Sequence, residues 1–344
     1  MYSESDLDAA VAAGKLSAEA ADDFRRFVAA QKTGPAVDEE YVRLLTGFND
    51  IFVSIAILLV LGAVSFTAGA GPVKCAIVAA VSWGLAEYFT RRRRMALPSI
   101  LLLLSYAGGV AGLLLWGAGQ IGGGPFRLTV QNADPLLALG LAVAAVLMAG
   151  AIYAHWRRFR VPITIAAGTT MVLLACIGVL LTAVPVLDRY WPWLVFAAGL
   201  GVFTLALRWD MADLARTTRR TDVAFWLHLL AAPLLVHPLF YLLGLLNKAN
   251  PGEGRAVIAI GIYLLLGLVA LLIDRRALLV SALGYVMFAL STVLKASGVV
   301  GQDLTYTALA AGAALLLLSA FWHKARLAVL SLAPARLRRR LPAA

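Results

Sequence analysis

The 344-residue sequence has few charged residues and almost no cysteine. Asp, Glu, Lys and Arg make up 14% of the chain, against about 25% in typical soluble domains. Two cysteines cannot build a disulfide framework or a cysteine-based metal motif. A disulfide-stabilised secreted domain is therefore excluded, and we expect Cys75 and Cys176 to be buried bystanders in or beside apolar segments.

The sequence also lacks a recognisable catalytic apparatus. It contains no Ser-His-Asp or Cys-His set, no paired carboxylates within an apolar segment, no zinc-ligand spacing and no glycine-rich phosphate loop ending in Lys-Ser or Lys-Thr. We therefore expect no enzymatic activity, no metal and no other cofactor. The net charge of +11 comes from Lys and Arg scattered over short segments, which favours anionic inner-leaflet lipids over nucleic acid as the partner.

Hydrophobic residues, in contrast, make up 61% of the chain, which is too much for one water-soluble core. The apolar runs are continuous, and ten of them approach the roughly 20 residues needed to cross a bilayer as a helix. The expected fold class is all-α, a polytopic membrane bundle. The ten expected spans are Ile51–Ala70, Pro72–Thr90, Leu97–Gly117, Leu136–Ala154, Val161–Val184, Trp191–Leu207, Val223–Leu246, Ala256–Ile273, Ala277–Leu294 and Tyr306–Trp322.

The distribution of Lys and Arg predicts the orientation of these spans. With the N-terminus in the cytoplasm, 24 basic residues flank the cytoplasmic ends and 6 lie on the other side. Cytoplasmic flanks collect Lys and Arg, so we expect both termini to be cytoplasmic.

The chain ends predict two smaller elements. Residues 1–48 should form a cytoplasmic helical hairpin and an interfacial lead-in, with Ser3 and Ser17 as N-caps and Gly14 ending the first helix. Residues 49–323 form the ten-span domain, and residues 324–344 a basic amphipathic cytoplasmic tail at the inner leaflet. A hairpin this small should dock on its own membrane domain, a second copy or a protein partner.

The spans also suggest an internal repeat. Spans 2–3 and 6–7 turn through arginines at the cytoplasmic side, and spans 4–5 and 8–9 do the same. The spacings between corresponding turns are 123 residues from Arg93 to Arg216 and 117 from Arg158 to Arg275. A four-span unit repeated once is one hypothesis, and two inverted five-span halves, as in many transporters, are the other.

Ionisable residues within spans are costly and therefore indicate candidate sites. His228 and His237 lie in span 7 with Pro233 and Pro238. Their separation puts them on opposite helix faces, about 13.5 Å apart along the axis, so they cannot share one metal. The prolines predict a kink or local unwinding. Such a broken helix could serve a transport path, or the histidines could simply pack against neighbouring carbonyl groups.

Glu87, near the cytoplasmic end of span 2, is the remaining candidate path residue. Arg91 follows four residues later, the spacing of a helical ion pair. The pair could serve transport or could extend to the interface without a function. His155, beside the basic turn, we expect at the membrane interface, and we expect Gly108, Gly109 and Gly112 in span 3 to let helices approach closely.

The segment from Leu7 to Ser17, with its Leu…Gly-Lys-Leu-Ser pattern, resembles the helical hairpin that precedes the spans in uncharacterised bacterial polytopic membrane proteins of the domain-of-unknown-function type. The entry to span 1, Gly47 to Phe52, is similar to theirs. This resemblance implies a bacterial inner-membrane protein and brings no activity or site residue. The ten spans match the drug/metabolite transporter superfamily in number only. We expect a transporter or flippase of a small molecule or lipid-linked compound; the alternative is a non-transporting assembly or regulatory protein that binds a partner through its hairpin.

Overall fold

The computed structural model describes residues 4–32, 48–67, 71–121, 135–213, 216, 218–245, 253–296 and 303–334. Within these ranges every regular element is a helix, which confirms the all-α fold class. The chain divides into two compact units, Met1–Val42 and Arg43–Ala344, and each is described by itself below.

The first unit contains a helical hairpin of α1 (Glu4–Ala12) and α2 (Ala18–Lys32). Gly14 ends α1 with a positive φ of 63°, and the hydroxyl of Ser17 accepts a hydrogen bond from the Ala20 amide at the start of α2. Both predicted signals are confirmed, whereas Ser3 lies outside the described residues. Leu7 and Ala21 are buried between the helices.

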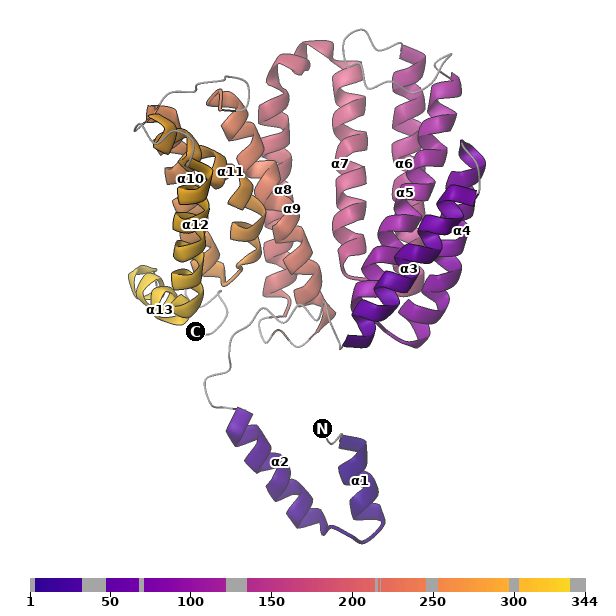
Figure 1. The fold of residues 1–344 in the computed structure, drawn as a ribbon, viewed down its shortest axis with the longest axis vertical. Helices are drawn as coiled ribbons and strands as arrows, with labels where there is room; N and C mark the ends of the chain where they lie inside the picture. Colours follow the sequence, from indigo (N-terminus) through magenta and orange to yellow (C-terminus); the bar gives the residue numbers. More distant parts are fainter. Residues whose placement is uncertain are drawn as a thin grey trace. The chain divides into compact units, whose positions relative to one another are not determined.

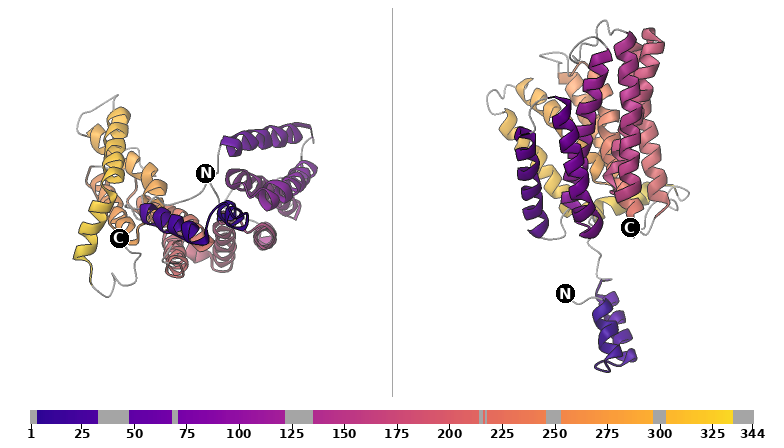
Figure 2. Two further views of the ribbon diagram at one scale, coloured as in Figure 1. Left: turned by 90° about the horizontal axis from the view of Figure 1, so that it is seen from below. Right: turned by 90° about the vertical axis from the view of Figure 1, so that its right-hand side faces the viewer.

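The second unit is a bundle in which consecutive long helices run in alternating directions (Figures 1 and 2). Each expected span coincides with one helix of this series. The helices are α3 (Phe48–Thr67), α4 (Pro72–Ala86) with the π-helical turn η1 (Glu87–Arg92), α5 (Ala96–Ile121), α6 (Pro135–Phe159), α7 (Ile163–Ala183), the 3₁₀ turn η2 (Pro185–Tyr190), α8 (Trp191–Met211), α9 (Arg219–Leu242), α10 (Glu253–Ile273), α11 (Ala277–Ala296), α12 (Asp303–Ala320) and α13 (Trp322–Leu332).

Seven of the described helices are long and apolar enough to cross a membrane, and α12 with α13 makes an eighth candidate if that bent pair counts as one span. The apolar parts of α10 and α11, Val257–Ile273 and Ala277–Thr292, are shorter. At 1.5 Å per residue each reaches about 25 Å, against a hydrocarbon core of about 30 Å. The chain is therefore a multi-pass helical membrane protein.

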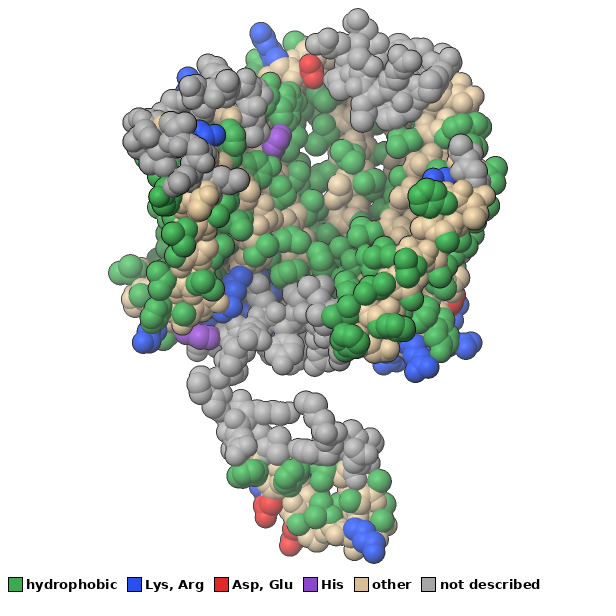
Figure 3. Space-filling view, in the orientation of Figure 1, with side chains coloured by type: hydrophobic (Ala, Val, Ile, Leu, Met, Phe, Trp, Pro, Cys, Tyr) green, Lys and Arg blue, Asp and Glu red, His purple; other side chains and the backbone are tan. Residues whose placement is uncertain are grey.

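The surface of this unit fits a lipid environment. Large hydrophobic side chains such as Phe52, Leu59 and Leu316 are exposed, and hydrophobic atoms dominate the face in Figure 3. Such a surface would aggregate in water but is the normal exterior of a helix in lipid. Cys176 is exposed on this exterior, so the prediction that it is buried is wrong; Cys75 is half-buried, and both thiols are free.

Four helix-to-helix turns lie at one end of the bundle, which we call the basic end (Figure 1). They connect η1 to α5, α6 to α7, α8 to α9 and α10 to α11. Each holds one non-glycine residue with a φ near 55°, an uncommon left-handed conformation: Arg94, Arg160, Arg216 and Asp274. The outer connection from α7 to α8 is built differently, on a 3₁₀ turn. The four described turns of the basic end thus share one backbone signature, which favours a repeated hairpin unit.

Gly109 lies at a close approach between α4 and α5, as predicted for it and for Gly112, whereas the prediction for Gly108 is wrong. A Cβ atom at this position would lie 2.7 Å from the carbonyl oxygen of Cys75 and 2.9 Å from the amide nitrogen of Ala79. Both are backbone atoms, so only a shift of the whole helix could make room.

We predict that Gly109→Ala destabilises the protein by about 1–3 kcal/mol through overpacking. The matched control is Gly108→Ala, because a Cβ there meets nothing within 4 Å. Unfolding by SDS titration in mixed micelles measures both; equal effects of the two substitutions would contradict the prediction.

Candidate functional site: a buried ion cluster

A group of charged and hydrogen-bonding side chains is buried at the basic end, between α8, α9, α13 and the turn from α10 to α11. We call it the ion cluster. Its members are Asp210 on α8, Arg216 in the turn from α8 to α9, His228 on α9, Asp274 and Arg275 in the turn from α10 to α11, and Trp322 and Arg326 on α13.

The first half of the ion cluster is centred on the Asp210 carboxylate. Nε2 of His228 lies 2.7 Å from its Oδ2, and Nε of Arg275 donates to the same oxygen at 3.2 Å. Nη2 of Arg275 donates to Oδ1, so the guanidinium binds the carboxylate through two nitrogens. His228 and Arg275 are 0% and 1% exposed. One carboxylate thus connects three separate elements.

The second half is centred on the Asp274 carboxylate. Arg216 donates to its Oδ2 from Nη1 at 2.6 Å and to the backbone oxygen of Asp274 from Nη2 at 3.0 Å. The indole Nε1–H of Trp322 donates to Oδ1 at 2.7 Å, and Nε of Arg326 lies 3.7 Å from the same oxygen.

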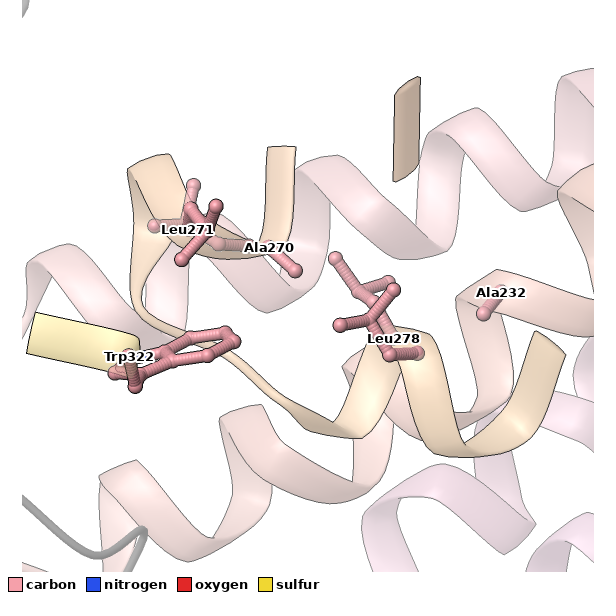
Figure 4. Close-up of a cluster of buried hydrophobic side chains, with 7 residues drawn as sticks. Ala232, Ala270, Leu271, Leu278 and Trp322 are labelled. Atoms are coloured by element: carbon pink, nitrogen blue, oxygen red, sulfur yellow. The ribbon is translucent and has the colours of Figure 1, made fainter. Parts of the chain in front are cut away.

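Apolar side chains pack around the ion cluster. Trp322 packs with Ala270 and Leu271 of α10 and Leu278 of α11, and Ala232 of α9 completes this group (Figure 4). Phe203 of α8 meets the His228 ring edge-on with centroids 5.5 Å apart. Electrostatic interactions are stronger in such a low-dielectric setting than at an exposed surface.

The environment of Asp274 sets its ionisation. Burial opposes charge, but the hydrogen bond from Trp322 and the cationic Arg216 and Arg326 outweigh it and hold the pKa of the carboxyl below its usual value. A carboxyl whose folded pKa is depressed stabilises the fold above its unfolded pKa, and this contribution disappears as the pH falls through the folded pKa.

We therefore predict that the unfolding midpoint of the solubilised protein falls as the pH is lowered below about 4, the ordinary pKa of Asp. In Asp274→Asn the fall should be smaller, because the variant carboxamide cannot take up that proton. Thermal unfolding across this pH range measures the difference, and an identical pH dependence in both proteins would refute the assignment.

His237, on the same helix as His228, has a different environment. Its Nδ1 lies 3.1 Å from the hydroxyl of Tyr285 on α11, and its ring lies near Trp191. The structure thus does not bring the two histidines together. It also keeps α9 helical from Arg219 to Leu242 through Pro233 and Pro238, so the helix is not unwound there, and the predicted kink stays a prediction. Much of α9 is buried against its neighbours, and this packing supports the helix across its prolines.

Glu87 also lies at the basic end, in η1. Its predicted pair with Arg91 is present at 3.4 Å, and a stronger pair joins it to Arg158 of α6, at 2.6 Å from Nε and 3.0 Å from Nη2. Glu87 lies next to the turn between α4 and α5, and Arg158 lies next to the turn between α6 and α7. The carboxylate of one hairpin therefore binds an arginine of the next hairpin. The same relation holds between Asp210 and Arg275.

His155 is completely buried among Trp83, Tyr106 and Phe159, and its predicted location at the membrane interface stays a prediction. It is buried because its side chain points from α6 toward α4 and α5. Within the described part of the chain neither ring nitrogen has a hydrogen-bond partner.

The sequence interpretation selected His228 but missed its partners Asp210 and Arg275, and the whole Asp274 half. The available signal was a carboxylate close to an arginine beside two of the turns: Asp210 follows Arg208, and Asp274 precedes Arg275.

Comparison with protein-family models, curated proteins and solved structures finds no match to this chain.

Proposed function

We propose that the protein is a transporter or flippase of a small molecule or lipid-linked compound, with ten spans in the bacterial inner membrane and both termini in the cytoplasm. The observation that carries this proposal is the ion cluster. Buried charges in a membrane protein are costly, and they are typical of ion and substrate paths. The proposed activity is movement of a molecule, and it includes no chemical conversion, metal or cofactor.

In this proposal the ion cluster is a latch that closes the cytoplasmic end. The Asp210 carboxylate holds the turn from α10 to α11 through Arg275 and holds α9 through His228. Uptake of a proton by His228 or Asp210 would change the hydrogen bonds of this carboxylate and weaken its ion pair with Arg275. An imidazole can accept and release a proton, which makes it suited to proton coupling. The other charged groups of the ion cluster are Arg216, Asp274 and Arg326.

The pair of Glu87 and Arg158 would be the corresponding latch in the first half of the repeat. It joins the first hairpin to the second at the same end of the bundle, as Asp210 and Arg275 join the third to the fourth. It is partly exposed, so it should hold less strongly than the buried pair. Two latches of unequal strength would allow the halves to open in sequence. His237 and Pro233 would lie farther along the path on α9.

Transport is tested by loading vesicles that contain the purified protein. We expect at least one compound from a cell extract to accumulate under a proton gradient, detected by mass spectrometry against protein-free vesicles. His228→Ala should reduce this accumulation by more than about tenfold, a loss of about 1.4 kcal/mol or more. Glu87→Ala and His237→Ala should reduce it less.

His323→Ala is the matched control, because this histidine is exposed on α13. It should transport like the wild type. Wild-type levels in the variants of His228, Glu87 and His237 together would refute the assigned path, and no accumulation by folded wild-type protein would refute transport.

The ten-span topology has its own test. Green fluorescent protein fused to either terminus should fluoresce, and alkaline phosphatase fused there should be inactive, because both ends are cytoplasmic. Fusions after α10 and after α11 should give opposite results if these shorter helices each cross the bilayer. A periplasmic reporter at either terminus would contradict the proposed orientation.

The alternative, a non-transporting assembly or regulatory protein, is favoured by one feature of the first unit. Phe27 of α2 is 58% exposed, and Phe24 on the same helix is 38% exposed. An apolar surface on a small hairpin suits a protein partner. Deleting residues 1–34 should then remove a co-purifying partner and leave membrane insertion unaffected.

A further inference from the structure

Helix α13 follows α12 after a single residue, Phe321, and is bent away from it by 75°. It therefore cannot continue through the bilayer in the direction of α12. A helix that leaves a spanning helix at such an angle lies close to the membrane plane, where amphipathic helices bind. Figure 1 shows it at the basic end of the bundle.

One face of α13 is fixed to the protein. Trp322, Arg326 and Leu330, four residues apart, are buried. Trp322 and Arg326 contact Asp274, and Ala325 and Val329 pack against the group around Leu271. This face of α13 is thus part of the ion cluster.

The exposed part of α13, with its N-cap residue Phe321, carries hydrophobic side chains and a lysine. Phe321, Leu327 and Leu332 are 50%, 56% and 88% exposed. Lys324 is exposed as well, and its Nζ lies 5.6 Å from the centre of the Phe321 ring. Large apolar side chains and a lysine on one short helix are typical of the boundary between acyl chains and headgroups.

We propose that α13 is a lipid-binding surface for acidic phospholipids. Leu327, Leu332 and Phe321 enter the acyl boundary, and Lys324 binds the headgroup phosphate. Continuity with α12, the bend and the positive charge favour lipid over a soluble protein as the occupant. Because Trp322 and Arg326 hold Asp274 from the same helix, lipid bound on the outer face stabilises the ion cluster on the inner face. This inference requires a membrane-spanning chain but not transport, so the two proposals fail independently.

The test uses the full-length protein in nanodiscs of phosphatidylcholine and phosphatidylglycerol. A fluorophore is attached to Leu327→Cys in a Cys75→Ala/Cys176→Ala background. Doxyl-labelled phosphatidylglycerol should quench it about fivefold more effectively than doxyl-labelled phosphatidylcholine at equal mole fraction, because one basic residue near an anionic surface contributes about 1 kcal/mol.

Lys324→Glu should abolish this preference and retain quenching by both lipids. Arg189→Glu, an exposed position on η2 away from the basic end, is the matched control and should behave as the wild type. Helix content by circular dichroism establishes that each variant is folded, and Lys324→Gln provides a milder second variant. Failure of both lipids to quench, or a preference that survives both changes at Lys324, would overturn the proposal.

The link to Asp274 is measured separately. Phosphatidylglycerol should raise the thermal midpoint of the wild type in nanodiscs and should raise that of Trp322→Phe less, because this variant lacks the indole donor to Asp274. An equal rise in both proteins would show that lipid binding does not reach the ion cluster.

Discussion

Asp210→Ala is expected to destabilise the protein by about 3–5 kcal/mol, the cost of removing one partner from a buried ion pair. Arg275 is 1% exposed and would lose both of its contacts to the carboxylate, and His228 would lose its partner at 2.7 Å. Neither side chain can reach water without moving a helix or a turn. SDS titration in mixed micelles measures the change.

Asp188→Ala is the matched control, because this aspartate is exposed in η2 of the same unit. Its effect should stay within about 0.5 kcal/mol. The double variant Asp210→Leu/Arg275→Met separates pairing from burial. Replacing both charges of a buried pair with apolar groups is often neutral or stabilising, so the double variant should recover most of the stability. If the double variant loses as much stability as Asp210→Leu and Arg275→Met lose together, the two residues are not coupled.

The same double variant distinguishes a structural role of the pair from a functional one. If the ion cluster has only a structural role, an apolar replacement that restores stability also restores transport. If it is a latch that responds to protons, the double variant is stable but inactive. A buried ion pair is weak evidence for stability in itself. The transport activity of the stable double variant therefore decides between the structural and the functional role.

The sequence predicted the helices well because their signals are local. Apolar runs of bilayer length located α3 to α12, and the short-range signals at Gly14 and Ser17 marked the hairpin. The pair of Glu87 and Arg91 was also predictable, since residues four apart in a helix are neighbours.

The ion cluster could not be predicted in this way, because its partners are far apart in the chain. Asp210 and Arg275 are separated by 65 residues, and Glu87 and Arg158 by 71. Helical periodicity relates residues within a few turns only. Which hairpins lie side by side depends on packing between helices that are distant in the sequence. The burial of His155 against Trp83 and Tyr106 could not be predicted for the same reason.

Trp322→Ala should cause the second large effect, a loss of about 3–5 kcal/mol typical of a buried large-to-alanine change. Trp322 is 2% exposed, and it joins α13 to α10 and to Asp274. Trp322→Phe keeps most of the ring packing but removes the N–H donor to a carboxylate. Its loss should be about 1.5–3 kcal/mol, the contribution of a hydrogen bond to a charged group. SDS titration of both variants divides the role of the indole into packing and hydrogen bonding.

Trp193→Ala is the control for this series, because this indole is 54% exposed on α8. Its effect should be within about 0.5 kcal/mol. Equal losses in the Phe and Ala variants would assign the whole effect to the bond with Asp274, and no loss in the Phe variant would assign it to packing alone. In Trp322→Phe, Asp274 keeps Arg216 and Arg326 but loses its neutral donor. A loss of stability in this variant that is smaller than in Trp322→Ala would therefore show that Trp322 both packs α13 against the protein and binds Asp274.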